Sequence, residues 1–491
     1  MNTLELFYQS LREMHTLGCI NATLEWDQQV NLPDKGASER AEQIAMMHTL
    51  LHAKRTAPEF VNAVKELCQR GDLSPEDSVN VRETWRTTEK ELKLPASFVE
   101  ESAKLASQCY HEWTSARPAN DFARVRPHLK RLFELAQHKA DLIGYEENPY
   151  DALLDSYEPY GKISQIKPLL LNLGEQLSTI IPQILEKQRP LPSSTGSHCI
   201  ESQHQLCLKV CSAIGYDFTS GRLDRAPHPF CTTLGAHDIR ITTRYSRDNY
   251  LSGLFTALHE AGHAIYEDGL VKKWVGTPMG SAISLGIHES QSRLWENIIG
   301  RGMPFARYLY SILGEFLPDL QRNTSPEEIW AHTNHIERSL IRVEADEVTY
   351  SLHVVIRMQL EVALLNKELK IDDLPAAWNE LYQKYVGITP PSDSDGVLQD
   401  VHWYHGLIGY FPTYALGNLY GAMMMDVIQK ALPSLDADIE RGDFTGLRTW
   451  LNTNVHQHGM AYTGPELIQK ISGRPLATDS FVTYVRRKFG V

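Results

Sequence analysis

Apolar residues recur every three to four positions along most of the chain. Leu4 and Leu11 show this spacing near the beginning, and Leu254, Leu258 and Ile265 show it in the middle. A stripe of apolar side chains with this period covers one face of a helix and turns that face towards a core. The pattern therefore predicts a mainly α-helical protein.

One short segment has the alternation of a strand instead. In residues 237–246, Ile239 and Ile241 alternate with Arg240 and Thr242. Successive side chains of a strand point to opposite faces, so this alternation predicts a strand with one buried face. We expect a small β-structure near the middle of the chain.

Clusters of proline and glycine interrupt the helical pattern. They lie at residues 32–38, 189–197, 276–281 and 387–396, and such clusters are typical of turns and linkers. The cluster at 189–197 separates a charged helical part from a part in which histidine, tryptophan and tyrosine concentrate. We predict one unit over residues 1–491, with an N-terminal helical lobe at about 1–195 and a part at about 196–491 that carries the chemistry.

The charge balance narrows the possible partners. The 491 residues include 61 Asp and Glu against 48 Lys and Arg, a formal net charge of -13, which is the wrong sign for binding a phosphate backbone or an anionic membrane surface. No run reaches the roughly 18 apolar residues of a membrane span, and the acidic, amphipathic start of the chain is unlike a secretory signal. Seven cysteines without a CxxC pair are interpreted as reduced structural thiols. We predict a cytoplasmic protein with neither nucleic-acid nor membrane partners.

The segment 254–269 carries the strongest chemical pattern of the chain. It contains His259, Glu260 and His263 in the arrangement HExxH, within a stretch of helical apolar spacing. Side chains four residues apart lie on one face of a helix about 6 Å from each other, so both imidazoles can reach one zinc ion at about 2.0–2.1 Å. Glu260 then lies beside the metal without binding it.

A catalytic zinc site has three protein ligands and an open position for water. The segment 285–300 again has helical spacing and carries Glu289 near its start. Two antiparallel helices joined by the loop at 269–283 would bring this carboxylate opposite the histidines, so Glu289 is the predicted third ligand. Two other interpretations are a histidine pair that is hydrogen-bonded within a core and a closed structural zinc site, which cysteine ligands would favour.

Residues 341–353 add a cation and a carboxylate. Arg342 can bind a carboxylate through two hydrogen bonds, and Asp346, about one turn further on, could accept a hydrogen bond from a zinc-bound imidazole. The alternative is an exposed helix face with salt bridges.

Residues 396–418 mix aromatic side chains with hydrogen-bond donors. A well-placed donor to a developing oxyanion contributes about 3 kcal/mol, and four side chains here can act as one: His402, His405, Tyr410 and Tyr414. The alternative is that this glycine-rich aromatic stretch forms core and turns.

These residues lie in motifs that occur together in one known family. The chain resembles the M32 family of metallocarboxypeptidases, the carboxypeptidase Taq type, in the identity and order of its motifs. They are HPF at 228–230, DxRxT at 238–242, HExxH at 259–263, HESQ at 288–291, IRxxAD at 341–346 and GxxQDxHW at 396–403. The segment 22–45 and the stretch GYFPTYALG at 409–417 are also similar to the family, so the resemblance extends over nearly the whole chain.

The resemblance implies a helical, cleft-shaped metallopeptidase fold similar to neurolysin and angiotensin-converting enzyme, with a small β-sheet lining the cleft. It implies one zinc ion per chain, for which cobalt could substitute, and a homodimer. It also implies substrate contacts from His228 and Gln399, and from Arg240 or Arg342, either of which could hold a terminal carboxylate. An extended peptide could add to the edge of the sheet through main-chain hydrogen bonds.

The resulting hypothesis is a zinc-dependent metallocarboxypeptidase of broad specificity that releases single residues from peptides with a free C-terminus. Glu260 is predicted to take the proton of a zinc-activated water. Tyr410, Tyr414 and His402 are predicted to stabilise the oxyanion. One alternative is an oligopeptidase or dipeptidyl carboxypeptidase of the same fold. Another is a non-catalytic zinc-containing binding protein, although such a protein would have no use for Glu260.

Overall fold

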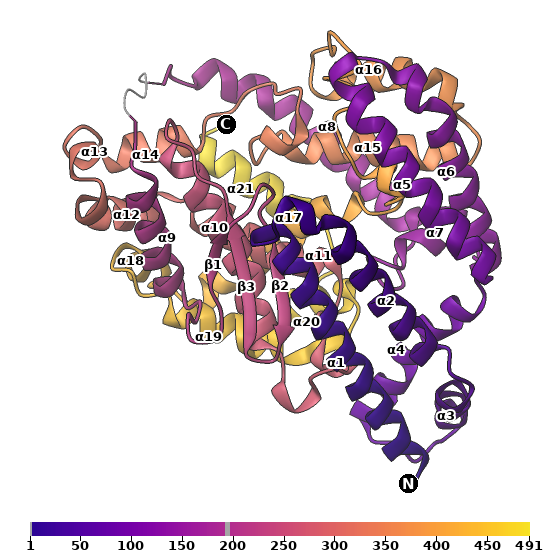
Figure 1. The fold of residues 1–491 in the computed structure, drawn as a ribbon. Coiled ribbons are helices and arrows are strands. Elements are labelled where there is room, and N and C mark those ends of the chain that lie inside the picture. Colours follow the sequence, from indigo (N-terminus) through magenta and orange to yellow (C-terminus); the bar gives the residue numbers. More distant parts are fainter. Residues whose placement is uncertain (1, 192–196) are drawn as a thin grey trace.

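The chain folds into a mainly helical protein with one small sheet, as the sequence predicted (Figure 1). The structure, a computed structural model, describes residues 2–191 and 197–491. Within these residues no helix is long and apolar enough to cross a membrane.

Up to residue 191 the chain is a succession of helices. Side chains cap several of their free backbone N–H groups: Asn2 and Glu5 form a reciprocal capping pair at the first helix, and Ser74 caps the fourth. The predicted break at 32–38 falls at the junction of the first two. The helices are α1 (Thr3–Val30), α2 (Ala37–Arg55), α3 (Pro58–Cys68), α4 (Pro75–Leu92), α5 (Ala96–Ala119), α6 (Phe122–Ile143), α7 (Pro149–Leu154) and α8 (Ile163–Lys187).

After residue 197 the chain is helical again, except for the sheet. The helices are α9 (Ile200–Ile214), α10 (Tyr250–Gly269), α11 (Leu285–Arg293), α12 (Met303–Phe316), α13 (Pro318–Arg322), α14 (Pro326–Thr333), α15 (Tyr350–Leu365), α16 (Leu374–Tyr385), α17 (Pro412–Ala431), α18 (Leu435–Glu440), α19 (Thr445–Asn454), α20 (Gly464–Ser472) and α21 (Asp479–Phe489). Short 3-10 turns lie between helices along the chain: η1 (Asp34–Gly36), η2 (Lys272–Trp274), η3 (Pro278–Gly280), η5 (Arg342–Glu344), η6 (Ile371–Asp373), η7 (Trp403–His405) and η8 (His456–Ala461).

The sheet has three strands in the order β1-β3-β2. They are β1 (Leu223–Arg225), β2 (Cys231–Gly235) and β3 (Asp238–Thr243), and β3 confirms the strand predicted within 237–246. The central strand pairs in parallel with β1 and antiparallel with β2. Its residues Ile239 and Ile241 are buried, and α10 packs against β3 and β2. The strand β2 is therefore an edge strand held beside the HExxH helix.

The segment 285–300 is not one regular α-helix. After α11 ends at Arg293, the chain continues as a π-helical turn, η4 (Leu294–Ile299). A π-turn is wider than an α-turn and changes which side chains share a face. This turn carries Glu296, whose carboxylate contacts His259 on α10. Apolar spacing alone does not distinguish the two kinds of helix.

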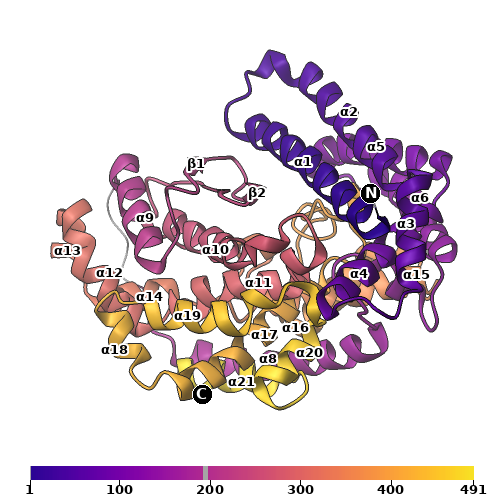
Figure 2. The ribbon, with the colours of Figure 1, turned by 90° about the horizontal axis from the view of Figure 1, so that it is seen from below.

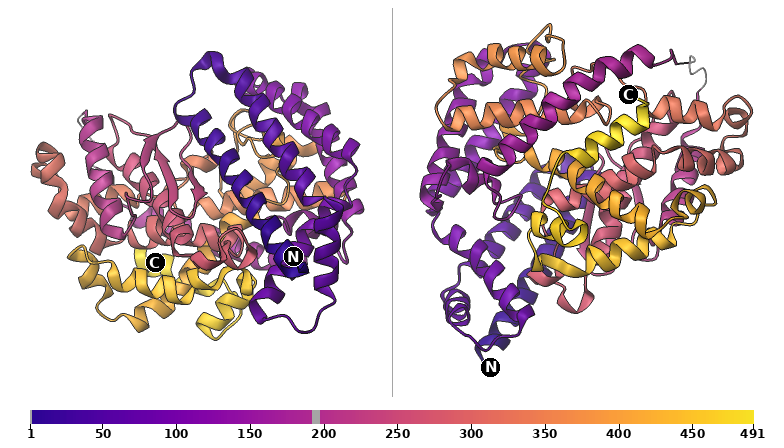
Figure 3. Two further views of the ribbon diagram at one scale, coloured as in Figure 1. Left: turned by 60° about the horizontal axis from the view of Figure 1, so that its bottom comes forward. Right: turned by 180° about the vertical axis from the view of Figure 1, so that it is seen from behind.

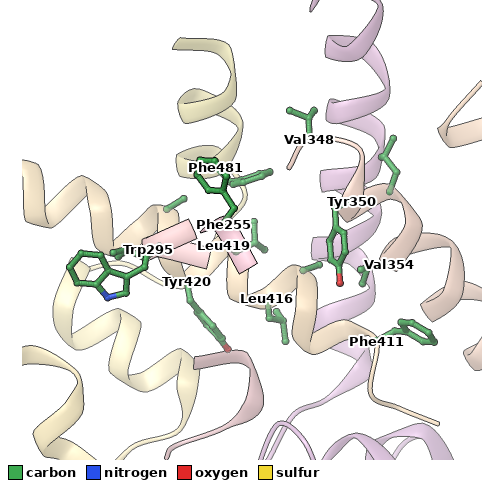
Figure 4. Close-up of a cluster of buried hydrophobic side chains, with 14 of the residues drawn as sticks. Phe255, Trp295, Val348, Tyr350, Val354, Phe411, Leu416, Leu419, Tyr420 and Phe481 are labelled. Atoms are coloured by element: carbon green, nitrogen blue, oxygen red, sulfur yellow. The ribbon is translucent and has the colours of Figure 1, made fainter. Parts of the chain in front are cut away.

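The hydrophobic core is centred on α17. Its residues Leu416, Leu419 and Tyr420 are fully buried and lie between aromatic side chains such as Trp295 and Tyr350 (Figure 4). Burying one such side chain contributes about 1.5–3 kcal/mol. The helix α11, which carries Glu289, packs directly on α17, so the core fixes this glutamate in place.

The N-terminal helix α1 lies beside the sheet. The helix α1 contacts β2 (Figures 2 and 3). Phe7, Leu11 and Phe60 belong to a small hydrophobic cluster of α1–α4 that is separate from the main core. A cavity of about 600 Å³ is lined by residues of α1, α4 and β2 and of the segment 270–282.

Helices from both sides of the predicted lobe boundary share the main core. The helices α15 and α16 contact α8, and α15 also contacts α6. The boundary segment 189–197 lies between α8 and α9, and residues 192–196 fall outside the described residues. The division at about residue 195 stays a prediction.

Candidate metal centre and active site

The helix α10 presents the HExxH residues on one face. Asn249 is its N-cap, and the side chain of this residue accepts hydrogen bonds from two backbone N–H groups of the first turn. His259 and His263 follow one turn apart, and both rings lie near Glu289 of α11. The segment 270–284 joins the two helices, as predicted.

Two nitrogen atoms and one oxygen atom converge between these helices. Nε2 of His259 and Nε2 of His263 lie 3.8 and 3.7 Å from Oε2 of Glu289, and one donor atom from each residue lies within 4.8 Å of the others. Two ligand atoms bound about 2.0–2.1 Å from a tetrahedral ion are about 3.4 Å apart. The three side chains therefore fit a divalent metal ion that keeps a position open for water.

Glu296 supports the ring of His259. Its Oε2 lies 2.9 Å from Nδ1 of His259, and Arg301 donates to Oε1 at 2.9 Å. Burial alone would raise the pKa of Glu296, but the hydrogen bond with His259 and the charges of Arg301 and Arg293 hold this pKa well below its usual range. The charged carboxylate accepts from Nδ1 and leaves Nε2 free to face a metal.

Asp346 does not have the role that the sequence predicted. Its carboxylate accepts hydrogen bonds from the backbone N–H groups of Val348 and Thr349, so it stabilises the chain just before α15. The prediction was wrong because Glu296, on another element, already occupies the place beside His259. The sequence did not predict a role for Glu296, although this residue lies about two turns after Glu289 in the same apolar run.

His288 and Glu267 lie behind the second histidine. Nδ1 of His288 is 2.5 Å from Nδ1 of His263, and Nε2 of His288 is 2.9 Å from Oε1 of Glu267. The sequence did not predict a role for either residue. The available signal was their position, directly before Glu289 and one turn after His263.

Glu260 is buried next to the three donor residues, with 7% of its surface exposed. Burial raises the pKa of its carboxyl to about 7; His259 lowers this pKa, and Glu289 and Glu296 raise it. A carboxyl group with a pKa near neutrality can both accept and return a proton at physiological pH.

Three of the predicted oxyanion donors lie together. Nε2 of His402 is 3.2 Å from the hydroxyl oxygen of Tyr414, and the rings of Tyr410 and Tyr414 are 5.2 Å apart. Burial lowers the pKa of His402 to about 3, so its ring is neutral at physiological pH. His405 is exposed and stacks instead on Tyr110, with 4.4 Å between ring centroids.

Tyr350 and Arg293 connect this aromatic cluster to Glu289. The guanidinium of Arg293 lies 4.3 Å from the centre of the Tyr350 ring, and its Nε donates to Oε1 of Glu289 at 2.6 Å. The rings of Tyr350 and Tyr414 are 5.9 Å apart. The tyrosines and the three donor residues therefore belong to one continuous site.

Arg342 also lies in the aromatic cluster, whereas Arg240 lies on the sheet. Arg342 donates to Asp400 at 2.8 Å, and its exposure of only 5% excludes the exposed helix face that was its alternative. Arg240 forms an ion pair with Asp238 of the same strand and stacks on Trp26 of α1 at 4.2 Å.

Gln399 supports Arg342 instead of facing open space. Its side-chain oxygen accepts from the backbone N–H of Arg342 and from Nη2 of Arg357, and its amide nitrogen donates to the backbone oxygen of Leu340. The polar atoms of this side chain are thus used within the protein. His228 is exposed in the loop between β1 and β2, and the described contacts do not join it to the aromatic cluster.

A helical protein with an HExxH helix and a glutamate donor from a second helix has the features of a metallopeptidase. The sequence profile of the carboxypeptidase Taq (M32) metallopeptidase family matches residues 6–489. The chain is 39% identical to thermostable carboxypeptidase 1 of Thermus thermophilus, with 99% of each chain covered. It is 35% identical to carboxypeptidase 1 of Bacillus subtilis, with 98% of this chain and 97% of that protein covered.

Solved structures agree with this similarity. The M32 carboxypeptidase of Deinococcus radiodurans R1 superposes with a TM-score of 0.97 at 37% identity, covering 100% of this chain and 99% of that one. Metallocarboxypeptidase 1 of Trypanosoma cruzi superposes with a TM-score of 0.96 at 31% identity, with 99% of each chain covered.

The chain belongs to the M32 family of metallocarboxypeptidases, as its motifs predicted. It is a peptidase that acts as a metal-dependent carboxypeptidase on peptide substrates. The family implies a divalent metal ion, and the site formed by His259, His263 and Glu289 fits one.

Proposed function

We propose that His259, His263 and Glu289 bind one zinc ion, and that the protein removes single residues from the free C-terminus of peptides with broad specificity. The observation that carries this proposal is the convergence of the three donor atoms beside the buried Glu260. Two imidazoles and a carboxylate are a ligand set of catalytic zinc. When bound, the metal supplies Lewis-acid activation of water and of the substrate carbonyl. Cobalt is proposed as a substitute.

Glu260 is the proposed general base and acid. Its position directly after His259 on α10 supports this role, because a carboxylate next to the three donor residues could take a proton from the attacking water. The same group then returns the proton to the leaving amine. Its burial keeps bulk water away from this transfer.

Tyr410, Tyr414 and His402 are the proposed donors to the oxyanion. They lie in one cluster that is connected to Glu289 through Tyr350 and Arg293. A donor that is already in place where charge develops stabilises the transition state more than the ground state.

Arg342 is the better candidate for holding the terminal carboxylate of the peptide. Arg342 and Arg357 share the single carboxylate of Asp400, which leaves one positive charge for another anion. Its guanidinium lies 5.2 Å from the ring of Tyr414, within the cluster of proposed oxyanion donors. Arg240 is already balanced by Asp238 and covered by Trp26. His228 and Gln399 are proposed to act on the substrate only indirectly, Gln399 by holding Arg342.

Broad specificity follows from main-chain recognition. The edge strand β2 lies beside α10, and a peptide added to such an edge is held mainly through its backbone. The preference for particular side chains is then weak.

The test is mass spectrometry of mixed peptides incubated with zinc- or cobalt-loaded protein, with and without a chelator. A chelator-sensitive ladder of single-residue truncations supports the proposal, and C-terminally amidated peptides should resist cleavage. Dipeptides or internal cuts would instead show an oligopeptidase or dipeptidyl carboxypeptidase. Zinc-loaded protein that leaves every peptide intact would point to the non-catalytic alternative, against which membership of the family already argues.

The protein is further proposed to be a cytoplasmic homodimer without nucleic-acid partners. Its seven cysteines all carry free thiols, as is usual in a reducing compartment. Its net charge of -13 opposes binding to nucleic acid. Sedimentation at several protein concentrations tests the dimer.

A further inference from the structure

The two histidines of the proposed metal site are supported in different ways. A carboxylate lies behind His259, because Oε2 of Glu296 is 2.9 Å from Nδ1 of His259. Behind His263 lies another imidazole, with the two Nδ1 atoms of His263 and His288 2.5 Å apart. The carboxylate on this side, Glu267, is one step further away, 2.9 Å from Nε2 of His288.

His263, His288 and Glu267 form a row of hydrogen-bonded groups, and one arrangement of protons satisfies this row. Nε2 of His263 faces Glu289 at 3.7 Å and would bind the proposed metal through its lone pair, which places the proton of the ring on Nδ1. Because two ring nitrogens this close cannot both carry protons, Nδ1 of His288 accepts from His263. Nε2 of His288 then carries the second proton and donates to Glu267. Each donor in this arrangement meets an acceptor.

The end of the row is attached to the sheet. The hydroxyl of Thr233 on β2 donates to Oε2 of Glu267 at 3.3 Å, and the ring of Tyr266 packs beside His288 with 5.3 Å between centroids. His288 and Glu267 are mostly buried, with side-chain exposures of 19% and 20%. The row therefore has a fixed geometry between the edge strand and the metal site.

We propose that His288 and Glu267 are positioning residues that fix the tautomer and the orientation of His263. This inference rests on the proposed metal site. The partners behind a metal-binding histidine keep its ring in place and raise its basicity, and their loss typically lowers metal affinity about 10- to 100-fold. Because Thr233 belongs to β2, the row also connects the metal ligand to the strand proposed to hold the peptide.

The test is the zinc dissociation constant, measured by competition with a chromophoric chelator. His288→Phe and Glu267→Ala should each weaken zinc binding about 10- to 100-fold. Glu267→Gln keeps an acceptor for His288 and should recover part of this loss. The matched control is Asp268→Asn, the neighbouring acidic residue of the same helix, which pairs with Lys272 at the surface and should bind zinc as the wild type does.

A purely structural role would give a different result. If His288 is a positioning residue, the visible absorption bands of cobalt-loaded His288→Phe should shift, because these bands report the geometry of the ligands. The metal-free variant should then unfold at a temperature close to that of the metal-free wild type. If His288→Phe does not fold, Glu267→Ala decides. Zinc affinity equal to the wild type in both variants overturns the positioning role, and so does an equal loss in Asp268→Asn.

His263→Ala separates this inference from the proposed function. If His263→Ala binds zinc as tightly as the wild type, the metal site itself is wrong. If it loses zinc while the His288 and Glu267 variants keep it, only the positioning role is wrong.

Discussion

Burial and charged neighbours together decide the protonation of the ionisable groups in the site. Asp400 is buried, which alone would raise its pKa, but the charges of Arg342 and Arg357 hold this pKa well below its usual range. Two guanidinium groups on one carboxylate leave a surplus of positive charge. In contrast, no arginine contacts Glu260 among the described interactions, and burial raises its pKa to about 7. Neighbouring residues thus give one carboxylate a structural role and leave the other able to exchange protons.

Replacing Glu260 by glutamine should abolish turnover without removing the metal. The amide keeps the size of the side chain but cannot accept the proton of water, and loss of a general base costs about 100- to 10,000-fold in kcat. Steady-state hydrolysis of a peptide and the zinc content of the purified protein check this together. Asp268→Asn, the same chemical change on the outer face of α10, should be fully active. A Glu260→Gln variant with more than about a tenth of the wild-type rate would contradict the role of Glu260.

Replacing Arg342 by lysine should weaken recognition of the free C-terminus. Lysine keeps the charge but loses the planar pair of donors. Hydrogen bonds to charged groups are worth about 1.5–3 kcal/mol, so kcat/KM for peptides with a free carboxylate should fall about 10- to 100-fold. Arg240→Lys, at the sheet, is the matched comparison and should have a much smaller effect. The reverse order of the two variants would assign the carboxylate to Arg240.

At the scale of helices, glycine residues allow the close packing that assembles the site. A Cβ atom at Gly262 of α10 would lie 2.8 Å from Cα of Ser292 on α11, and one at Gly417 of α17 would lie 2.6 Å from Cγ of Glu289. Real Cβ atoms do not approach this closely, so three helices meet through two glycines. Glu289 is held in place by this contact as well as by Arg293.

Gly417→Ala should therefore destabilise the protein and disturb the metal site. Overpacking of this kind costs about 1–3 kcal/mol, and the shift of α11 should weaken zinc binding. Urea denaturation of the metal-free form and chelator competition measure the two effects. Gly446→Ala is the control, because its Cβ atom would have no neighbour closer than 3.8 Å, and it should be neutral or slightly stabilising. Equal stability of the two variants would show that the α11–α17 contact can accommodate an added methyl group at Gly417.

At the scale of the whole molecule, buried polar groups join segments that are distant in the sequence. Glu158, between α7 and α8, accepts hydrogen bonds from the hydroxyl of Tyr420 at 2.8 Å and from the backbone N–H of Gly286 at 3.2 Å. One carboxyl thus connects the N-terminal helices to α17 and to the start of α11. Burial raises its pKa to about 7.

This pKa makes the stability of the protein depend on pH. The folded pKa of Glu158 lies above the value of about 4.3 for an unfolded chain. The stability contributed by the protonated group is therefore fully present below about pH 4 and is lost as the pH rises through about 7. Glu158→Gln is neutral at every pH, so its free energy of unfolding relative to the wild type should rise by about 3 kcal/mol between pH 4 and pH 8.

Chemical denaturation of both proteins across this pH range checks the prediction. Glu175→Gln, at an exposed position of α8, should follow the wild type throughout. A constant difference between Glu158→Gln and the wild type would show that Glu158 keeps one protonation state over the whole range.

The sequence by itself determined the features that depend on neighbours along the chain. Helical periodicity predicted a mainly α protein, alternation predicted β3, and the spacing of His259 and His263 placed both on one face of α10. These predictions succeed because a helix or a strand has a fixed geometry that its own residues reveal. The order of the motifs was enough to identify the family.

Only the tertiary structure decided which side chains support the site. It put Glu296 behind His259 and joined His288 and Glu267 to His263. It also used the carboxylate of Asp346 for hydrogen bonds within the turn before α15, which the sequence did not predict. It also put Arg342 in the aromatic cluster and Arg240 on the sheet. Such contacts join residues from different elements, and their choice depends on how whole helices pack against one another. The spacing of residues along the chain does not determine that packing. The partners of the two histidines could therefore be identified only from the tertiary structure.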